Sequence, residues 1–537
     1  MEDQSMAKGF AVLSFAGILV KVLSLLYIPV LRQPWMLGDK GYGIYGAAYT
    51  VFAFVFVLAN SGISVAISKI VSELIAKKNY KDAIVSFKIA RMLLLIAGIF
   101  LSILMFALAS PIAAFINKRS MLAIAALSPS IIFTVVASAY RGFFQGRGNM
   151  FPTAVSQIIE QITNIIFTLG LAALFLKYGG LEWACAGGAL GTGVAAMASV
   201  IFLIIYYRKN KNFKVSEPYS DINIERYSYK QLLKTILSYS FPITLCIGLQ
   251  YAGSVVDASN TMWRLRASGF SLDTASTLYA YLLYYQQLLM APIAISTALM
   301  STILPAISEA VALKDHILTQ KRMAFAYRLC FMFTIPAALA LSVLSAPIFR
   351  LLSFGPRYDL MLYGSSALIF LTIVQIQTAI LQGSGKLYRV VFNLVMGIVG
   401  KIIINYILIG IHGINIYGAI VGSISGYLIS IVLNYFTIQK HLKVDQNLVK
   451  RTVKPIISAA VMSIAVFIVY KGILLLPLFK SKAYLFVALA TATASVIGFF
   501  VYLFLMILIG GIKKNDMNIL PARLVRFIPK ALAGRVG

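Results

Sequence analysis

The stretch from Ala483 to Gly510 reads AYLFVALATATASVIGFFVYLFLMILIG, 28 residues without one charged side chain. A helix needs about 20 consecutive apolar residues to cross the hydrocarbon core of a bilayer, so this stretch predicts a membrane-spanning helix. Similar apolar runs, such as Met92–Leu108, recur along the chain of 537 residues, of which 60% are hydrophobic and only 12% are charged. A soluble protein carries roughly a quarter charged residues. The composition therefore predicts an all-α polytopic membrane protein.

The apolar runs predict about fourteen transmembrane helices. By residue number these helices are 9–31, 43–65, 89–116, 121–143, 151–176, 183–207, 233–257, 277–300, 324–348, 361–382, 389–410, 415–438, 452–471 and 483–510. The longest polar linker lies between the sixth and seventh helices. We therefore expect four regions: an N-lobe of helices 1–6 at 1–210, a linker at 211–232, a C-lobe of helices 7–12 at 233–440, and helices 13–14 with a basic tail at 441–537.

The net charge of +30 suggests nucleic-acid binding, but the distribution of the charges argues against it. With the N-terminus placed inside, 33 of the 47 Lys and Arg residues fall in the cytoplasmic loops and tails or at the adjoining helix ends, and 12 fall on the opposite side. This is the positive-inside bias of membrane proteins, and it places both termini in the cytoplasm. The acidic start, Met1-Glu-Asp, predicts a retained first helix rather than a cleaved signal peptide. The three cysteines lie in apolar runs and are expected to be buried hydrophobic residues.

The two predicted lobes repeat one another. The segment 66–78 after helix 2 matches 302–314 after helix 8 at five of thirteen positions. The tetrapeptide QGRG at 145–148 matches QGSG at 382–385, and Gly-Ala pairs recur later in each half. Because an even number of helices separates the repeats, the lobes have the same orientation. Such repeats are typical of transporters, whose substrate sites lie at the repeat interface and which work by alternating access.

Charged residues inside spans are costly and are therefore candidates for function. Helix 1 carries a polar stripe, with Lys21 midway along it: Ser14, Gly17, Lys21 and Ser24. Lys21 is expected either to bind phosphate in a cavity or to pair with a structural carboxylate. On helix 5, Glu160 and Asn164 share one face, and Glu160 could pair with Lys21 or Arg141, or exchange a proton.

Two further stripes lie in the second half. Helix 7 carries Gln250 and Asp257, and the stripe continues to Arg264 and Arg266. All four are expected to line the substrate cavity, and the planar guanidinium groups suit phosphate. The alternative is that both arginines are ordinary loop charges and that Asp257 pairs with a nearby cation. Helix 11 carries Asn393, Lys401 eight residues later and Asn405 four residues after that, so the three lie on one face. Lys401 is expected to be either a charge of the transport cycle or a structural ammonium group bonded to carbonyls.

Five motifs resemble one family of transporters: AISKIVSE at 66–73, YRGFFQG at 140–146, NMFPT at 149–153, SQIIEQ at 156–161 and LPAISE at 304–309. With the twelve-plus-two helix plan, they are similar to the multidrug/oligosaccharidyl-lipid/polysaccharide (MOP) exporter superfamily, in its branch of stage V sporulation protein B and MurJ-type lipid II flippases. The resemblance covers residues 1 to about 510. It implies a cation-lined cavity between the lobes and a groove near helices 13 and 14 for a polyprenyl tail.

The resemblance also implies roles for individual residues. Lys21 stands where members of this branch carry an arginine in helix 1, and Arg264 corresponds to their helix 7 arginine. With Arg32 and Arg266, these residues are expected to make the outer half of the cavity electropositive. Some relatives have acids on helix 11 for a sodium site, whereas this chain has Lys401, so sodium coupling is not expected.

The function implied is a flippase in a bacterial plasma membrane. It would move an undecaprenyl-pyrophosphate-linked cell-wall precursor, lipid II or a close relative, to the outer leaflet. We expect a monomer that needs membrane lipid and its lipid-linked oligosaccharide, with no metal, cofactor, nucleic acid or catalytic residues. Three alternatives remain: a flippase for a capsular or teichuronic-type unit, a multidrug cation antiporter, and a membrane glycosyltransferase. The antiporter should have cavity acids and twelve helices, and the transferase should have large outer loops.

Overall fold

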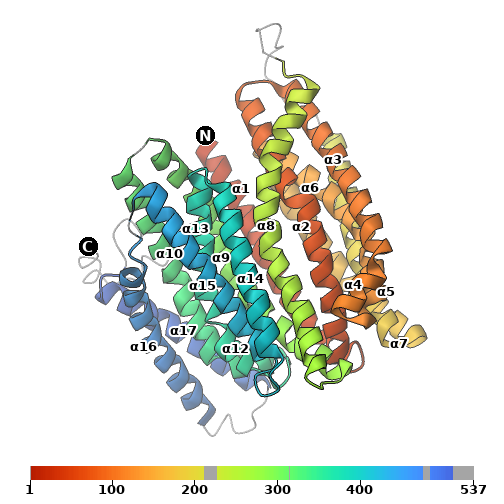
Figure 1. Cartoon of the computed structure of the whole chain (residues 1–537), viewed down its shortest axis with the longest axis vertical. Coiled ribbons are helices and arrows are strands. Elements are labelled where there is room, and N and C mark those ends of the chain that lie inside the picture. The colour runs from red at the N-terminus through yellow and green to blue at the C-terminus, as the bar shows by residue number, and fades with distance from the viewer. Residues whose placement is uncertain (1, 211–225, 314, 445, 476–483, 512–537) are drawn as a thin grey trace. The chain divides into compact units, whose positions relative to one another are not determined.

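The computed structural model describes residues 2–210, 226–313, 315–444, 446–475 and 484–511, and every regular element in these ranges is a helix (Figure 1). The helices are α1 Glu2–Leu31, α2 Gly38–Ala76, α3 Tyr80–Ala107, α4 Ala109–Ile116, the short 3-10 helix η1 Lys118–Ser120, α5 Met121–Leu127, α6 Ser130–Gly146, α7 Phe151–Asn210, α8 Tyr229–Ala267, α9 Leu272–Ala312, α10 His316–Val343, α11 Ser345–Leu351, α12 Asp359–Gly364, α13 Ala367–Gly383, α14 Leu387–Ile409, α15 Tyr417–Leu442, α16 Leu448–Leu475 and α17 Tyr484–Leu508. The predicted all-α class is confirmed.

Among the described residues, ten helices are long and apolar enough to cross a membrane. The count becomes eleven if Lys118–Leu127 and Ser130–Gly146, which meet at 44°, form one broken span. One of the ten is α7, whose 60 residues leave helical geometry at Gly180, where φ is 77°. A positive φ is easily adopted by glycine, so Gly180 joins two helices within α7. The chain is thus a multi-pass membrane protein, and the number of fourteen spans stays a prediction.

Some predicted helices are broken in the structure. The predicted helix 89–116 is α3 followed by α4, and the predicted helix 324–348 is α10 followed by α11. Both short helices carry a proline as their third residue, Pro111 and Pro347. Proline is tolerated in the first turn of a helix, where its missing N–H costs no hydrogen bond, and it disfavours helix in the residue before it. Hydropathy alone did not reveal these breaks because both sides of each break are apolar.

The internal repeat extends to the secondary structure. Helices α3 and α10 begin and end 236 positions apart, and so do the starts of α4 and α11. The N-cap residues Asn79 and Asp315 are the same distance apart, and each accepts a hydrogen bond from the main-chain N–H three residues later. Matching helix ends, caps and prolines at one offset support the duplication inferred from the loops. The predicted arrangement of the lobes stays a prediction.

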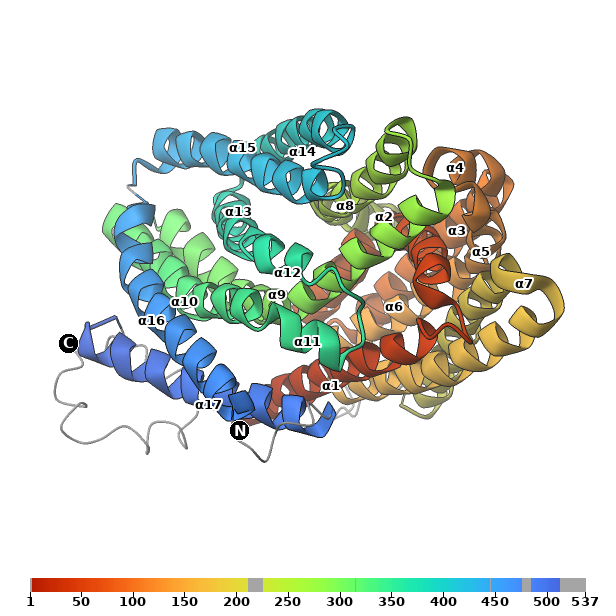
Figure 2. The ribbon, with the colours of Figure 1, turned by 90° about the horizontal axis from the view of Figure 1, so that it is seen from below.

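The chain forms two compact units. The first comprises Met1–Leu283 and Asn405–Ile416, and the second comprises Tyr284–Ile404 and Tyr417–Gly537. Helix α8, which was predicted to open the C-lobe, belongs to the first unit because it packs along α2. This contact is close: a Cβ atom on Gly62 would lie 1.9 Å from the carbonyl oxygen of Ser240, so only glycine fits there. Figure 2 shows α1 running beside α7 in the same unit.

An aromatic cluster holds the helices of the first unit together. Phe87 of α3 packs on Tyr140 and Phe143 of α6 and on Tyr207 of α7, with ring centroids 4.5 to 5.2 Å from the Phe87 centroid. Phe87 and Phe143 are fully buried. Buried aromatic pairs contribute about 0.5–1.5 kcal/mol each beyond their burial. Two of the four residues belong to the YRGFFQG motif, so this motif has a packing role.

In the second unit, α10 packs on α13 and α16, and α16 packs on α17. The hydroxyl of Tyr502 on α17 donates to the main-chain carbonyl of Met332 on α10, at 2.9 Å.

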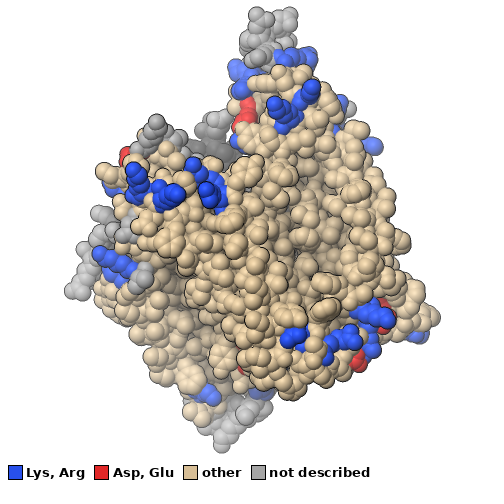
Figure 3. Space-filling model, in the orientation of Figure 1, with Lys and Arg blue, Asp and Glu red and all other residues tan. Residues whose placement is uncertain are grey.

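The three cysteines, Cys185, Cys246 and Cys330, are buried and free, as predicted. Figure 3 shows that uncharged residues cover most of the face in view and that Lys and Arg lie in separate groups toward its margins. This distribution suits a protein that spans a bilayer.

Candidate functional site

Lys21 lies on α1 with its side chain exposed. In the described part of the chain, Lys21 makes no hydrogen bond or ion pair, so no structural carboxylate neutralises it there. Ser24, one turn further on, donates to the carbonyl of Val20 at 2.8 Å. The side chain of Ser14, the first member of the predicted stripe, lies outside the described residues. Lys21 thus offers an ammonium group that no carboxylate of the described residues compensates, on an apolar helix.

Glu160 pairs with Arg141 rather than with Lys21. The Nη2 atom of Arg141 on α6 lies 2.5 Å from Oε2 of Glu160 on α7. Arg141 also donates to the hydroxyls of Ser156 and Ser199, both at 2.9 Å. These partners come from both helical parts of α7, so the arginine links α6 to each of them. Of the predicted alternatives for Glu160, the geometry matches the pair with Arg141, which compensates both charges.

Asn164 also lies between the two parts of α7. Its side-chain oxygen accepts hydrogen bonds from Thr168 at 2.9 Å and from Thr192 at 3.4 Å. Thr168 also donates to the carbonyl of Gly188 at 3.1 Å. Asn164 therefore takes part in the polar contacts that hold the two helical parts of α7 together.

The predicted polar stripe of helix 7 lies along α8, which extends to Ala267 and so includes Arg264 and Arg266 in the helix. Asp257 is buried, with 3% of its surface exposed, and accepts a hydrogen bond from the amide of Asn405 at 2.9 Å. Gln250 and Arg266 are exposed. The structure thus brings Asp257 and Asn405, which were predicted on separate stripes, into direct contact within the first unit.

Arg264 is held by the end of α14. Its Nε atom donates to the carbonyl of Tyr406 at 2.7 Å, and its guanidinium carbon lies 4.2 Å from the centroid of the Tyr406 ring. In the described chain Arg264 has no ion pair, so its charge is opposed only by carbonyl and ring dipoles. Cations near a helix C-terminus are favourable because unpaired carbonyls gather there. Arg264 is therefore a positioned and formally uncompensated cation, rather than a freely mobile loop charge.

Arg32 differs from Lys21 and Arg264. Its guanidinium group makes two hydrogen bonds to the carboxylate of Asp39, at 2.8 and 3.0 Å, across the turn between α1 and α2. Tyr281 donates to the same carboxylate at 3.2 Å. Arg32 thus carries a compensated charge, and the pair bridges the turn. Its predicted place in an electropositive cavity stays a prediction.

In the second unit, Asn393 on α14 donates to Asn434 and Thr437 on α15, at 2.8 and 3.2 Å. Lys401 lies two turns further along α14 and is buried, with 7% of its surface exposed. It lies on the face that meets α15, because a Cβ atom on Gly426 of α15 would lie 3.0 Å from the Cβ atom of Lys401. Lys401 is therefore enclosed between two helices.

Sequence analysis missed an ion cluster at the start of α9. Asp273 binds Nζ of Lys40 at 2.5 Å and Nη1 of Arg119 at 2.6 Å. Arg119 also lies 3.8 Å from the carboxylate of Glu182. The hydrogen bond from Lys40, helped by the charge of Arg119, lowers the pKa of Asp273 below its usual value. No spacing rule links these four residues, because they are brought together only by the fold.

The described residues contain no group of three or more His, Cys, Asp or Glu side chains that could hold a metal ion. The chemistry that the residues above offer is electrostatic. Among the described residues, Lys21 and Arg264 have no carboxylate partner, whereas the acids Glu160, Asp39 and Asp273 each have a basic partner. Uncompensated cations on apolar helices suit an anionic ligand such as a phosphate.

Comparisons with known proteins identify the family. A family model described as polysaccharide biosynthesis protein matches residues 6–311, more than half of the chain, and the chain belongs to this family. The chain is 27% identical to the lipid II flippase MurJ of Bacillus subtilis (strain 168), over 98% of this chain and 99% of that protein. It is 25% identical to stage V sporulation protein B of the same organism, over 83% of this chain and 86% of that protein.

Solved structures of other proteins share the fold. The fold is similar to that of lipid II flippase MurJ in an inward closed conformation, with a TM-score of 0.65 and 17% identity over 93% of this chain and 98% of that chain. It is also similar to an inward-facing multidrug resistance transporter of the MATE family and MOP superfamily, with a TM-score of 0.63 and 15% identity over 80% of this chain and 96% of that chain. The resemblance inferred from the motifs is confirmed.

Proposed function

We propose that this chain is a flippase that moves an undecaprenyl-pyrophosphate-linked cell-wall precursor, lipid II or a close relative, from the inner to the outer leaflet. The observation that carries the proposal is the end-to-end similarity to the lipid II flippase MurJ of Bacillus subtilis, which includes 98% of this chain and 99% of that protein. The full-length match includes α16 and α17, which follow the twelve helices predicted for the duplicated lobes.

The physical requirements of this transport are met by the charged residues of the chain. A pyrophosphate-linked sugar is charged and cannot cross hydrocarbon unaided, because burying an unpaired charge is costly. It therefore needs cations along its path, and Lys21 and Arg264 are positioned without a neutralising carboxylate in the described chain. Arg264 presents a planar fork that suits phosphate oxygens, and its stacking on Tyr406 orients that fork. Gln250, Arg266 and Arg32 are proposed to line the same path.

The remaining candidates are assigned supporting roles. Glu160 and Asn164 are tied into the contacts of α7, and Asp257 and Asn405 join α8 to the end of α14. We assign these four residues to holding helices in register during the transport cycle. Lys401 and Asn393 have the same role between α14 and α15. Movement of the charged headgroup would follow alternating access, with both termini in the cytoplasm and the protein acting as a monomer.

The same phosphate chemistry would serve a capsular or teichuronic-type unit, and a sporulation role is supported by the match to stage V sporulation protein B. Complementation separates these substrates. Cells depleted of their lipid II flippase should regain growth when they express this chain, whereas a capsule-flippase mutant should not regain its capsule. Rescue of the capsule mutant alone would contradict lipid II as the substrate and favour the alternative. A chain that extrudes cationic dyes and rescues neither strain would instead be a multidrug antiporter.

A further inference from the structure

A ladder of aromatic rings runs along α2 in the first unit. Its members are spaced three or four residues apart, so they lie on one side of the helix. Each ring packs on the next, with centroids 5.6 to 6.4 Å apart, in the order Tyr42, Tyr45, Tyr49, Phe52 and Phe56. Aromatic pairs at this separation attract one another, so neighbouring rings hold each other in place. The ladder therefore gives α2 a rigid aromatic side.

Tyr49 differs from its neighbours in this ladder because its side chain is accessible. It is 41% exposed, whereas Tyr45 and Phe52 are each 4% exposed. Tyr45 packs towards α7, since a Cβ atom on Gly188 would lie 3.5 Å from the Cε2 atom of Tyr45. Two buried rings thus hold Tyr49 from both sides along the helix, while part of its own surface stays accessible to a ligand.

The surroundings of Tyr49 are polar. Tyr49 interacts electrostatically with Glu160 of α7 and with Tyr251 of α8. The side chain of Glu160 is 30% exposed although it pairs with Arg141, and an exposed carboxylate in a membrane-spanning region faces the bundle interior or water rather than acyl chains. A tyrosine of an interfacial aromatic belt would face lipid instead. The exposed part of Tyr49 therefore adjoins a polar region of the first unit.

A second exposed tyrosine lies on α8. Tyr251 is 42% exposed and directly follows Gln250, which is proposed to line the transport path. Helix α8 packs along α2, and the approach is close at Gly248, where an added Cβ atom would lie 2.9 Å from Cδ2 of Leu58. Tyr49 and Tyr251 thus come from two packed helices of one unit and lie near enough to interact.

Cations and aromatic rings suit different parts of one substrate. Lys21 and Arg264 suit phosphate oxygens, but a charged side chain does little for the apolar face of a sugar. A pyranose ring has a face of C–H bonds surrounded by hydroxyl groups. The negative face of an aromatic ring attracts polarised C–H bonds, and a tyrosine hydroxyl can donate to or accept from a sugar hydroxyl. Tyrosine also makes such a contact at low entropy cost, because it has only two side-chain torsion angles.

We propose that Tyr49 and Tyr251 bind the sugar of the transported headgroup, and that they select substrates with a pyranose ring next to the pyrophosphate. This inference rests on the proposed flippase function and adds the groups that recognise the sugar. A lipid-linked pyrophosphate without a sugar is then held by the cations alone. Selection by the two tyrosines keeps this bare carrier lipid, which has the same pyrophosphate and the same tail, from competing for the path.

The test compares two ligands on the same purified full-length variants. Binding of lipid II and of undecaprenyl pyrophosphate, which lacks the sugar, is titrated by native mass spectrometry in one detergent. We expect Tyr49→Ala and Tyr251→Ala each to bind lipid II about fivefold more weakly, the scale of one aromatic contact, and to bind undecaprenyl pyrophosphate as the wild type does. Tyr49→Trp, which keeps an aromatic ring, should retain most of the lipid II affinity.

The matched control is Tyr178→Ala, which removes a tyrosine of α7 that is 75% exposed. It should bind both ligands as the wild type does. An equal loss for both ligands in Tyr49→Ala would point to a change in the fold rather than to a lost sugar contact, and would overturn the inference. Unchanged binding of lipid II by Tyr49→Ala and Tyr251→Ala would overturn it as well.

Transfer of lipid II between leaflets is measured separately on reconstituted protein. A wild type that binds lipid II in preference to undecaprenyl pyrophosphate, but does not transfer it, contradicts the proposed function and leaves the sugar contact in place. A wild type that transfers lipid II, while both alanine variants bind it normally, refutes only the sugar contact. A wild type that does not bind lipid II contradicts both.

Discussion

Arg264 and Tyr406 are in contact both through the main chain and through their side chains. The Nε atom of Arg264 donates to the carbonyl of Tyr406 at 2.7 Å, and the guanidinium group lies over the Tyr406 ring. Gly410 leaves room for the guanidinium group in this position, because a Cβ atom there would lie 2.1 Å from Nη2 of Arg264 and would push the group aside. The planar group is therefore fixed at the end of α14, where it can present its remaining donors in one orientation.

Gly410→Ala should displace the Arg264 guanidinium group and lower both transport and stability. We expect a loss of about 1 kcal/mol in unfolding free energy, the scale of a cation–π contact with its hydrogen bond. Thermal unfolding and reconstituted transport measure the two effects. Gly413→Ala is the matched control in the same loop, because an added Cβ there meets nothing within 4 Å. Equal behaviour of the two variants would show that the position of Arg264 does not matter.

The Arg141–Glu160 pair should be important for stability. Glu160→Gln leaves the partly buried Arg141 without its carboxylate, and breaking a buried pair from one side costs about 3 kcal/mol. The control is Glu73→Gln, which removes an exposed pair with Lys69 at 3.7 Å, and such pairs contribute about 0.5 kcal/mol or less. Thermal unfolding of both variants in one detergent gives the comparison. If the two losses are equal, the pair contributes no more than a surface contact.

Asp273 should make stability depend on pH on the acid side. Its folded-state pKa is lowered, first by the hydrogen bond from Lys40 and also by the charge of Arg119. A carboxyl group with a lowered folded-state pKa stabilises the fold above its unfolded-state pKa, and this stabilisation is lost as pH falls through the folded-state value. Melting temperatures measured from pH 7 to pH 3 should therefore fall less steeply for Asp273→Asn than for the wild type. Identical pH profiles would contradict this role.

Transport should not require sodium. Lys401 is enclosed between α14 and α15, where a fixed ammonium group would repel a second cation. At 4 Å and an effective dielectric constant of 20, this repulsion is about 4 kcal/mol. Flipping by reconstituted protein should proceed at similar rates in sodium-containing and sodium-free buffers of matched ionic strength. A strong dependence on sodium would defeat the prediction.

The sequence predicted the helical class, the duplication and the location of most spans because hydropathy and spacing report burial directly. It did not predict the break between α3 and α4, since apolar residues continue through the break. It left the partner of Glu160 open between Lys21 and Arg141, because two cations were within reach of one acid and only packing selects between them. The contacts of Asp273 and a pocket beside Arg328 join segments far apart in sequence, and no local pattern encodes them.

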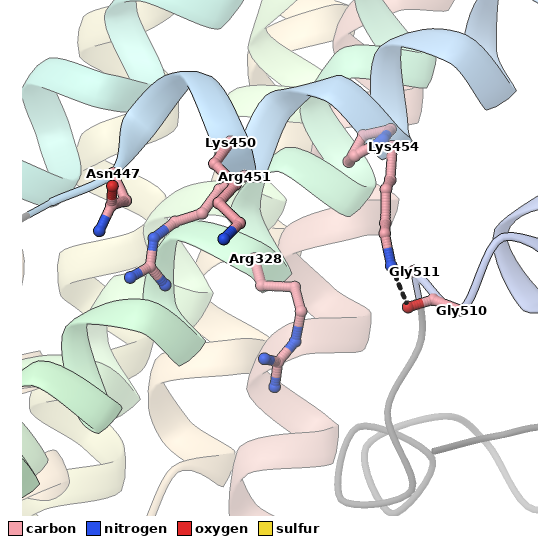
Figure 4. A pocket seen from close by; sticks show the side chains of 8 residues that line it. Arg328, Asn447, Lys450, Arg451, Lys454, Gly510 and Gly511 are labelled. Atoms are coloured by element: carbon pink, nitrogen blue, oxygen red, sulfur yellow. Dashed lines mark hydrogen bonds between the residues drawn. The ribbon is translucent and has the colours of Figure 1, made fainter.

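A pocket in the second unit is lined by Arg328 of α10 and by three basic residues of α16 (Figure 4), and the sequence held a signal for it. Lys450, Arg451 and Lys454 fall within the first two turns of a helix and share the spacing of one face. We interpreted the bias of Lys and Arg only as a marker of orientation, which it also is. This spacing would have indicated that the three residues lie together, although their neighbour Arg328 could be found only from the fold.

The central claim, that cations on the apolar helices carry an anionic lipid-linked headgroup, is tested most directly at Lys21. Purified wild type, Lys21→Ala, Lys21→Arg and Lys88→Ala are reconstituted at equal density, and transfer of lipid II between leaflets is measured. Lys88 is an exposed lysine on α3 and serves as the matched control. We predict loss of transfer in Lys21→Ala, partial transfer in Lys21→Arg, and wild-type transfer in Lys88→Ala. Wild-type transfer by Lys21→Ala, or no transfer of lipid II by the wild type itself, would contradict the account.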